Sequence, residues 1–269
     1  MMTLCRDHDQ MALRFADICS QAGVRIMDIY QTDFETNTKL DKSPVTEADE
    51  VAEEVILKAL EQDFPGIPVL AEESFSAGFR PDTTGEFLLV DPIDGTREFI
   101  SRNGEFTVNI ALIEKARPVA GCVYAPARHQ TFYGARSAWT APVAAGKSVQ
   151  DCSPTRIQTR PVPVAGPTAV MSRSHVDADT LEFAERHGVS PENRVSAGSS
   201  LKFCLIASGQ ADLYPRFGPT MEWDTGAGHA VLNAAGGRVT RPDGGEFLYG
   251  KKAAGYFNGP FVAWGQSAD

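Results

Sequence analysis

Two stretches near the start of the chain carry apolar residues at steps of three and four positions, the spacing of one face of an amphipathic helix. In residues 9–29 this face includes Met11, Phe15 and Ile18. The same spacing recurs over residues 46–63, and the Pro and Gly residues that follow cannot continue a helix. The pattern therefore predicts two N-terminal helices separated by a polar loop.

The rest of the chain alternates short apolar runs with further helical patterns. Strands are predicted over residues 69–71, 87–90, 107–113, 118–124, 130–134, 168–171 and 211–214, and helices near residues 177–187, 200–208 and 224–235. This mixed order favours a layered α/β (α+β) sandwich over a barrel. Residues 141–166 are rich in Pro, Ala, Ser and Thr, so we expect an N-terminal α+β lobe, residues 1–145, and a C-terminal α/β lobe, residues 146–269.

Composition and charge narrow the class of protein. The 269 residues can bury a sizeable core. Asp and Glu number 35 against 25 for Lys and Arg, and the net charge of −10 would repel nucleic-acid phosphates and anionic membranes. No run reaches the roughly 18 apolar residues of a membrane span, and the polar start does not resemble a signal peptide. We therefore expect a soluble cytoplasmic protein that is not a general nucleic-acid binder.

The cysteines point to the same compartment. Five of them are scattered along the chain, and no two form a CxxC pair. An odd, scattered set argues against a zinc ribbon and against a disulfide framework. The sequence predicts reduced, mostly buried thiols.

The most informative segment, residues 91–96, follows a predicted strand and reads Asp-Pro-Ile-Asp-Gly-Thr. The carboxylates of Asp91 and Asp94, in a segment bent by Pro and Gly, can converge on one point. Carboxylate oxygens suit Mg²⁺, which keeps waters for a substrate to displace. The amides of Gly95 and Thr96 can seat a phosphate where a short helix begins.

Two other interpretations of this segment deserve weight. Asp-Pro-x-Asp-Gly is also ordinary turn chemistry, and that alternative stays open for the isolated segment. A calcium loop fails, because its third and twelfth positions would be Ile93 and Arg102, which bear no carboxylate.

Further acids follow or open predicted elements elsewhere. Glu72 follows an apolar run and Asp224 opens a helix, although each singly could be a solvated acid or a helix cap. If Glu72 and Asp224 meet Asp91 and Asp94, about four negative charges share one place and require cations. Two or three Mg²⁺ would neutralise them. A cluster of carboxylates neutralised by Mg²⁺ is typical of a site for metal-assisted phosphoryl transfer.

Four segments in order, residues 43–49, 70–74, 91–96 and 223–225, resemble the motifs of the lithium-sensitive, Mg²⁺-dependent inositol monophosphatase superfamily. Residues 104–113, 172–175, 198–203 and 214–219 are similar to its 3′(2′),5′-bisphosphate nucleotidase branch of the bacterial CysQ type. The resemblance covers roughly residues 14–237 and implies an αβαβα sandwich of two lobes with the active site between them. Where it implies Ala, the chain has Gly226, which can loosen the turn that presents Asp224.

The resemblance implies roles for the acidic residues. The first Mg²⁺ would be held by Glu72, Asp91 and the carbonyl of Ile93, and the second by Asp91, Asp94 and Asp224. Asp49 would accept a hydrogen bond from the Thr96 hydroxyl, and this pair, with Glu72, would orient and deprotonate the attacking water. The amides of Gly95 and Thr96 would cradle the phosphate.

On the far side of the site, the resemblance implies that His175, Ser199, Lys202 and Arg216, together with Asp224, bind the nucleotide. A second phosphate needs cations beyond the metals. Lys202 and Arg216 stand in apolar contexts that suit this role, although surface side chains with snorkelling stems occur in the same contexts. A structural histidine also remains open for His175.

The implied reaction is hydrolysis of adenosine 3′,5′-bisphosphate to AMP and phosphate. 3′-Phosphoadenylyl sulfate is the second implied substrate, which links the enzyme to sulfate assimilation, and Li⁺ should inhibit. The expected location is the cytoplasm, with a weak peripheral contact at the inner membrane left open. A broad inositol or sugar monophosphatase is the nearest alternative. A non-catalytic Mg²⁺ or nucleotide sensor is a more distant one, since Asp49, Glu72 and Thr96 are all present.

Overall fold

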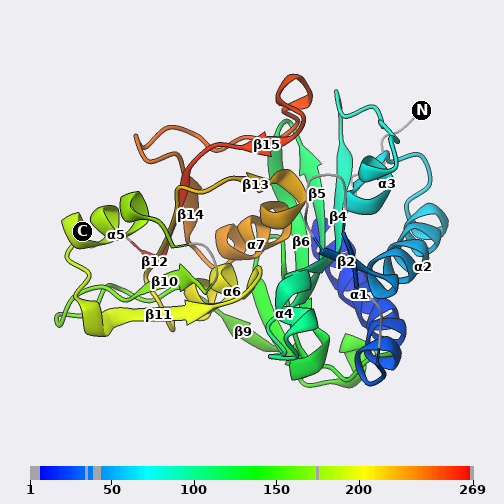
Figure 1. Ribbon diagram of the computed structural model, residues 1–269, viewed down its shortest axis with the longest axis horizontal. Coiled ribbons are helices and arrows are strands. Elements are labelled where there is room, and N and C mark those ends of the chain that lie inside the picture. The colour runs from blue at the N-terminus through cyan, green and yellow to red at the C-terminus, as the bar shows by residue number, and fades with distance from the viewer. Residues whose placement is uncertain (1–6, 34–35, 39–43, 174–175, 267–269) are drawn as a thin grey trace.

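The structure, a computed structural model, describes residues 7–33, 36–38, 44–173 and 176–266. Figure 1 shows its layers side by side: two N-terminal helices, a large sheet, two inner helices, a second sheet and an outer helix. This αβαβα sandwich is the predicted fold class. Within the described segments, no helix is both long enough and apolar enough to cross a membrane.

The first layer consists of α1 (His8–Tyr30) and α2 (Glu47–Asp63), and both confirm the predicted helices. Asp7 caps α1 by accepting a hydrogen bond of 3.1 Å from the Asp9 amide. The predicted apolar face of α1, which includes Phe15, is buried against the first sheet. Two short antiparallel strands, β1 (Thr36–Thr38) and β2 (Pro44–Thr46), precede α2.

The first sheet has seven strands in chain order. They are β3 (Val69–Ala71), β4 (Phe87–Asp94), β5 (Thr107–Glu114), β6 (Arg117–Ala125), β7 (Gln130–Gly134), β8 (Ala138–Pro142) and β9 (Thr155–Ile157). β3 and β4 are parallel, and every other neighbouring pair is antiparallel. Because helices cover both faces of the central strands, these strands read as continuous apolar runs. β8 and β9 were not predicted, and β9 lies beyond residue 145.

The second sheet has the order β11-β10-β12-β16-β14. Its strands are β10 (Ala169–Ser172), β11 (Arg194–Ala197), β12 (Leu213–Arg216), β14 (Arg238–Thr240) and β16 (Phe261–Trp264). α6 (Leu201–Ala207) and α7 (Glu222–Ala234) lie between the sheets, and α5 (Ala178–Arg186) covers the outer face. β11, β14 and β16 were not predicted, and the last two come from the tail that the sequence resemblance left unmatched.

Short elements carry the chain between these layers. They include α3 (Glu72–Ser76), α4 (Thr96–Ile100), the 3-10 turns η1 (Pro126–Arg128), η2 (Val149–Asp151), η3 (Pro191–Asn193) and η4 (Lys252–Ala254), and the paired strands β13 (Thr220–Met221) and β15 (Phe257–Asn258). Four cysteines lie in the described part of the chain, all as free thiols. Cys19, Cys122 and Cys204 are buried and Cys152 is half-buried, as predicted.

Helix α7 packs so closely on β6 that one strand position has room only for glycine. A Cβ at Gly121 would lie 2.8 Å from the Ala230 Cβ and 2.9 Å from the Ala227 carbonyl oxygen.

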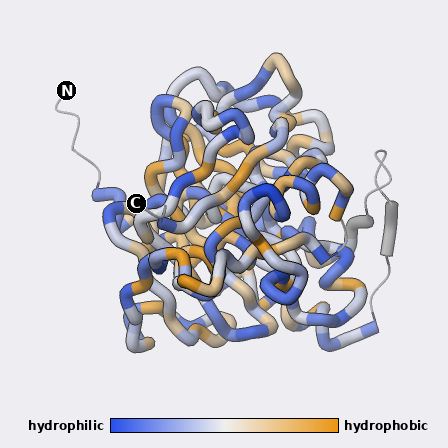
Figure 2. Tube along the Cα trace, turned by 90° about the vertical axis from the view of Figure 1, so that its left-hand side faces the viewer, coloured by the Kyte–Doolittle hydropathy of each residue, from blue (hydrophilic) through white to orange (hydrophobic). Residues whose placement is uncertain are grey.

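In Figure 2 apolar segments run through the middle of the molecule, and polar segments form most of its outer turns. α7 therefore belongs to the core, although its first turn carries Asp224.

Gly121→Ala should lower the free energy of unfolding by about 1–3 kcal/mol, because the added methyl group forces α7 away from β6. Gly85→Ala is the matched control, since no atom lies within 4 Å of its added Cβ. For the control we expect a change within about 0.5 kcal/mol. Urea denaturation measures both values. Equal stability of the two variants would contradict the close packing.

Candidate active site

A pocket of about 300 Å³ lies where the end of β4 meets strand β12 and the first turns of α6 and α7. The predicted site residues on its wall are Glu72, Asp91, Ile93, Asp94, Gly95, Thr96, Ser199, Lys202, Arg216 and Asp224. They come from both predicted lobes. Asp49 contacts Thr96 from α2, and His175 lies outside the described residues.

The segment from Asp91 to Thr96 is a strand end followed by a helix start, and the predicted turn chemistry is confined to Gly95 at the junction between them. β4 continues to Asp94, and its register against β5 shifts between Asp91 and Asp94. Gly95 takes a left-handed backbone conformation with φ 89°, and α4 begins at Thr96. A Cβ at Gly95 would lie 3.3 Å from the Ser199 Cβ, so the second lobe packs directly on this bend.

Asp49 is held in a fixed orientation in the first turn of α2, where it is 1% exposed. Its Oδ2 accepts hydrogen bonds of 2.8 Å from both the amide and the hydroxyl of Thr46. Its Oδ1 lies 3.4 Å from the Thr96 hydroxyl, at the long end of the hydrogen-bond range. The structure therefore contains the Asp49–Thr96 contact that the resemblance implies.

Hydroxyl groups from the second lobe orient Asp94. The hydroxyls of Ser199 and Ser200 donate to its Oδ2 over 2.8 Å and 2.9 Å. The Ser200 Oγ also lies 2.9 Å from the Asp224 carbonyl oxygen, which links the two acidic segments. On α7, the Asp224 carboxylate accepts a hydrogen bond of 2.8 Å from the Met221 amide. Ser200 was not predicted, although it lies beside Ser199 in the sequence.

Burial and like charge both act on the acidic wall. Burial raises the pKa of the Asp224 carboxyl well above its usual value, and the carboxylates of Asp94 and Glu72 raise it further. Within the described residues, no three His, Cys, Asp or Glu side chains stand close enough to hold a metal ion as they are. The donors on this wall are nevertheless all hard oxygens, the carboxylates and the Ile93 carbonyl, and so fit a hard divalent cation in kind.

Lys202 and Arg216 are buried at 6% and 8% exposure, so the surface interpretation of both is wrong. The Lys202 Nζ donates to the Ser199 carbonyl over 2.5 Å and lies 5.3 Å from the Tyr214 ring centre. The Arg216 guanidinium donates to the carbonyls of Gly218 and Pro219, both over 3.2 Å. Burial lowers the pKa of Lys202 to about 8, although the Asp94 carboxylate counteracts part of this effect.

Close packing explains why position 226 is a glycine. A Cβ there would lie 2.8 Å from the Leu89 Cδ1 and 3.3 Å from the Ala111 Cβ. The glycine therefore lets α7 approach the first sheet closely. Gly226 thus allows a tight contact beside Asp224. The low helix propensity of glycine had suggested a loosened turn instead.

The pocket also contains residues that the sequence did not single out. Arg97, Glu98, Tyr214 and Thr225 line its wall. Arg97 and Glu98 follow Thr96 in the sequence, whereas Tyr214 and Thr225 lie in segments 214–219 and 223–225, which carry the resemblance.

Residues 7–260 match the Inositol monophosphatase family. The chain belongs to this family. The match includes β14, β15 and the loop before β16, beyond the region in which the sequence motifs were recognised. Members of the family generally use Mg²⁺.

Individual relatives show which members of the family the chain resembles. The chain is 46% identical over 234 residues to the 3′(2′),5′-bisphosphate nucleotidase CysQ of Salmonella typhimurium, across 85% of this chain and 89% of that protein. CysQ of Escherichia coli strain K12 is 44% identical over 227 residues, 82% and 87% of the two chains. The crystal structure of CysQ from Bacteroides thetaiotaomicron has a TM-score of 0.76 at 34% identity and covers 96% of this chain and 97% of that one. These relatives confirm the resemblance and the predicted fold.

Lys202→Met should stabilise the protein most at neutral pH. Below pH 8 the wild-type folded chain bears the full cost of a buried ammonium group. Between about pH 8 and the ordinary pKa of 10.5, the unfolded chain keeps the proton that the folded chain has lost, so wild-type stability gains as pH rises. The advantage of the Met variant therefore shrinks over this window. Urea denaturation at pH 7 and pH 10 measures it, and a difference independent of pH would contradict the lowered pKa.

Proposed function

We propose that the chain is a Mg²⁺-dependent, lithium-sensitive 3′(2′),5′-bisphosphate nucleotidase. Its main reaction is hydrolysis of adenosine 3′,5′-bisphosphate to AMP and phosphate. 3′-Phosphoadenylyl sulfate is a second substrate, whose hydrolysis to adenylyl sulfate connects the enzyme to sulfate assimilation. The CysQ relatives, which are named as 3′(2′),5′-bisphosphate nucleotidases, support this proposal. We also propose that the lobes are residues 1–145 and 146–269, with β9 of the second lobe forming the last strand of the first sheet, and that the enzyme works in the cytoplasm.

The observation that carries the proposal is the distribution of charge around one pocket. Carboxylates lie on the walls formed by β4, α3 and α7, and the buried cations Lys202 and Arg216 lie on the walls formed by α6 and β12. A bisphosphate needs both kinds of wall, since one phosphate is attacked with the help of metals and the other needs cationic partners. A monophosphate on a neutral sugar needs the acidic wall alone.

The acidic wall would hold two or three Mg²⁺. The proposed ligands are Glu72, Asp91 and the Ile93 carbonyl for the first ion, and Asp91, Asp94 and Asp224 for the second. Bound there, Mg²⁺ supplies Lewis-acid stabilisation of the negative charge on the phosphate. The amides of Gly95 and Thr96 would donate hydrogen bonds to the same phosphate.

Asp49 and Thr96 would orient the attacking water. With its hydrogen directed at Asp49, the Thr96 oxygen can accept a hydrogen bond from that water. The water oxygen forms a bond to phosphorus while the bond from phosphorus to the 3′-oxygen breaks. The water gives up a proton toward Thr96 and Asp49, or toward Glu72, and the departing 3′-oxygen gains one. The products are AMP and phosphate.

The remaining proposed contacts bind the nucleotide on the far side of the scissile phosphate. They are His175, Ser199, Lys202 and Arg216, with Asp224 also touching substrate. Contacts of this kind suit a small nucleotide substrate. The net charge of −10 disfavours binding to the phosphates of a nucleic acid.

Wild-type protein with Mg²⁺ should release phosphate from adenosine 3′,5′-bisphosphate with a kcat/KM at least about tenfold above that for inositol 1-phosphate, and Li⁺ should suppress the reaction. Arg216→Ala should raise KM for the bisphosphate by about tenfold or more, because it removes a charged hydrogen-bond donor. KM for inositol 1-phosphate should change little. Arg25→Ala, at an exposed position of α1, is the matched control. A phosphate-release assay with the two substrates side by side measures each value.

Two results of that assay would contradict the proposal in different ways. A preference for inositol 1-phosphate would keep the metal chemistry and favour the broad inositol or sugar monophosphatase. No release from either substrate would overturn the enzymatic assignment itself.

Asp224→Asn should raise the Tm of the Mg²⁺-free protein, because it removes one of the repelling carboxylates. It should also reduce the Tm increase that Mg²⁺ produces in the wild type, and lower kcat by about 100-fold or more. Asp151→Asn, at an exposed position, is the control for the loss of a carboxylate. Thermal unfolding with and without Mg²⁺ gives the first two results, and an equal Mg²⁺ response in all three proteins would contradict the assigned ligand.

A further inference from the structure

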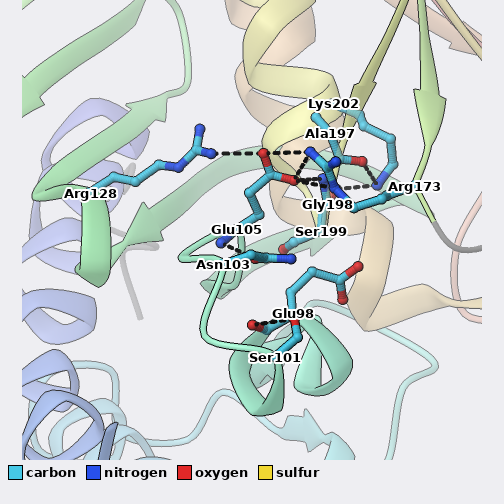
Figure 3. A network of polar contacts seen from close by, with 10 residues as sticks. All are labelled: Glu98, Ser101, Asn103, Glu105, Arg128, Arg173, Ala197, Gly198, Ser199 and Lys202. Atoms are coloured by element: carbon cyan, nitrogen blue, oxygen red, sulfur yellow. Dashed lines mark hydrogen bonds and ion pairs between the residues drawn. The ribbon is translucent and has the colours of Figure 1, made fainter. Parts of the chain in front are cut away.

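A second polar cluster lies beside the pocket, centred on the carboxylate of Glu105 (Figure 3). Glu105 precedes β5 and is 8% exposed. Arg173, just after β10, binds it in a bidentate manner, with Nε 3.1 Å from Oε2 and Nη2 3.0 Å from Oε1. Arg128, at the end of η1, approaches from the other side, with Nη2 2.8 Å from Oε1. Burial alone would raise the pKa of Glu105, but the hydrogen bonds from Arg173 and Gly198 outweigh this effect and hold the pKa below its usual value.

The same carboxylate also holds the loop that leads into α6. The Gly198 amide donates to Glu105 Oε2 over 2.8 Å. A Cβ at Gly198 would lie 2.8 Å from the Glu105 carbonyl oxygen and 2.9 Å from the Glu105 Cβ. The loop is therefore pressed onto Glu105. One buried carboxylate joins β10 and the start of α6 to the segment before β5, and so ties the second sheet to the first.

Ser199, the residue after Gly198, contacts both the acidic and the cationic wall of the pocket. Ser199 has a left-handed backbone conformation, φ 54°, which few residues other than glycine adopt. Its hydroxyl donates to Asp94 Oδ2 over 2.8 Å, and its carbonyl accepts from Lys202 Nζ over 2.5 Å. Ser199 thus joins an acidic residue to a cationic residue, and Glu105 holds the neighbouring amide.

We propose that Glu105 and Arg173 form a clasp that fixes the spacing between the two phosphate subsites. Both are positioning residues that act through Ser199, and neither is assigned a contact with substrate. The inference rests on the proposed function, in which Asp94 serves one phosphate and Lys202 the other. A bisphosphate needs both subsites at a fixed separation, whereas a nucleoside monophosphate needs one. The clasp is therefore a determinant of specificity for two phosphates.

The test compares adenosine 3′,5′-bisphosphate with adenosine 3′-monophosphate, each with Mg²⁺. Glu105→Gln keeps the size of the side chain and removes its charge, and Arg173→Gln removes the partner. In each variant KM for the bisphosphate should rise about tenfold, the effect of losing one charged hydrogen bond. The kcat/KM for the monophosphate should stay within about twofold, because Ser200 still donates to Asp94. The double variant should be no worse than either single one, since both break the same contact.

Arg128→Gln is the matched control, because it removes the other arginine and leaves the bonds from Arg173 and Gly198 in place. Its preference for the bisphosphate should change less than about threefold. Hydrogen–deuterium exchange supplies a readout without substrate, in which residues 197–203 should exchange faster in Glu105→Gln and Arg173→Gln than in the wild type and the control.

The outcomes separate the clasp from the proposed function. If the wild type hydrolyses the bisphosphate but the two clasp variants lose both substrates equally or keep the wild-type preference, the clasp is wrong and the function stands. Unchanged exchange over residues 197–203 would likewise overturn the clasp. If the wild type hydrolyses neither nucleotide, the proposed function fails and the clasp's role fails with it. Should Glu105→Gln not fold, Arg173→Gln decides, since its side chain is 47% exposed.

Discussion

Negative charge gathered at one pocket governs how the surrounding elements are arranged. Carboxylates with little access to water repel one another, and each must be oriented by neighbours or neutralised by cations. The fold places these carboxylates at the ends of different elements and aims hydrogen-bond donors at them, as with Ser199 and Ser200 at Asp94. Burial, and then the carboxylates of Asp94 and Glu72, raise the pKa of Asp224 in spite of these donors. The inner helix layer is needed because it brings Asp224 to the end of β4.

The elements that the sequence predicted are those whose patterns are local. The apolar face of residues 9–29 identified α1, because three- and four-residue spacing reports directly on which side of a helix is buried. The continuous apolar runs of β4, β5 and β6 were equally plain, since both faces of these strands are covered. The Asp-Pro-Ile-Asp-Gly-Thr segment and the acids on α3 and α7 were selected by residue type, and the pocket brings them together.

The features that escaped prediction depend on contacts between distant parts of the chain. β9 and β14 have three residues each, of which only one is apolar, so no apolar run marks either strand in the sequence. The burial of Lys202 follows from the sheets around it, so its own neighbours could not distinguish it from a surface lysine. Glu105 and Arg173 are 68 positions apart, and nothing in the spacing of charged residues signals that they pair. The place of His175 stays a prediction.

The order of strands in the second sheet has a consequence for biosynthesis. β12, which carries Arg216, pairs on one side with β10 and on the other with β16. β16 is translated after every proposed site residue, so β12 has an open edge until β16 has left the ribosome. Pairings between such distant segments also form slowly. All strands of the first sheet are translated before β10, whereas the wall that carries Arg216 is complete only once β16 pairs with β12. A growing chain thus carries its acidic groups for some time before it has a finished pocket.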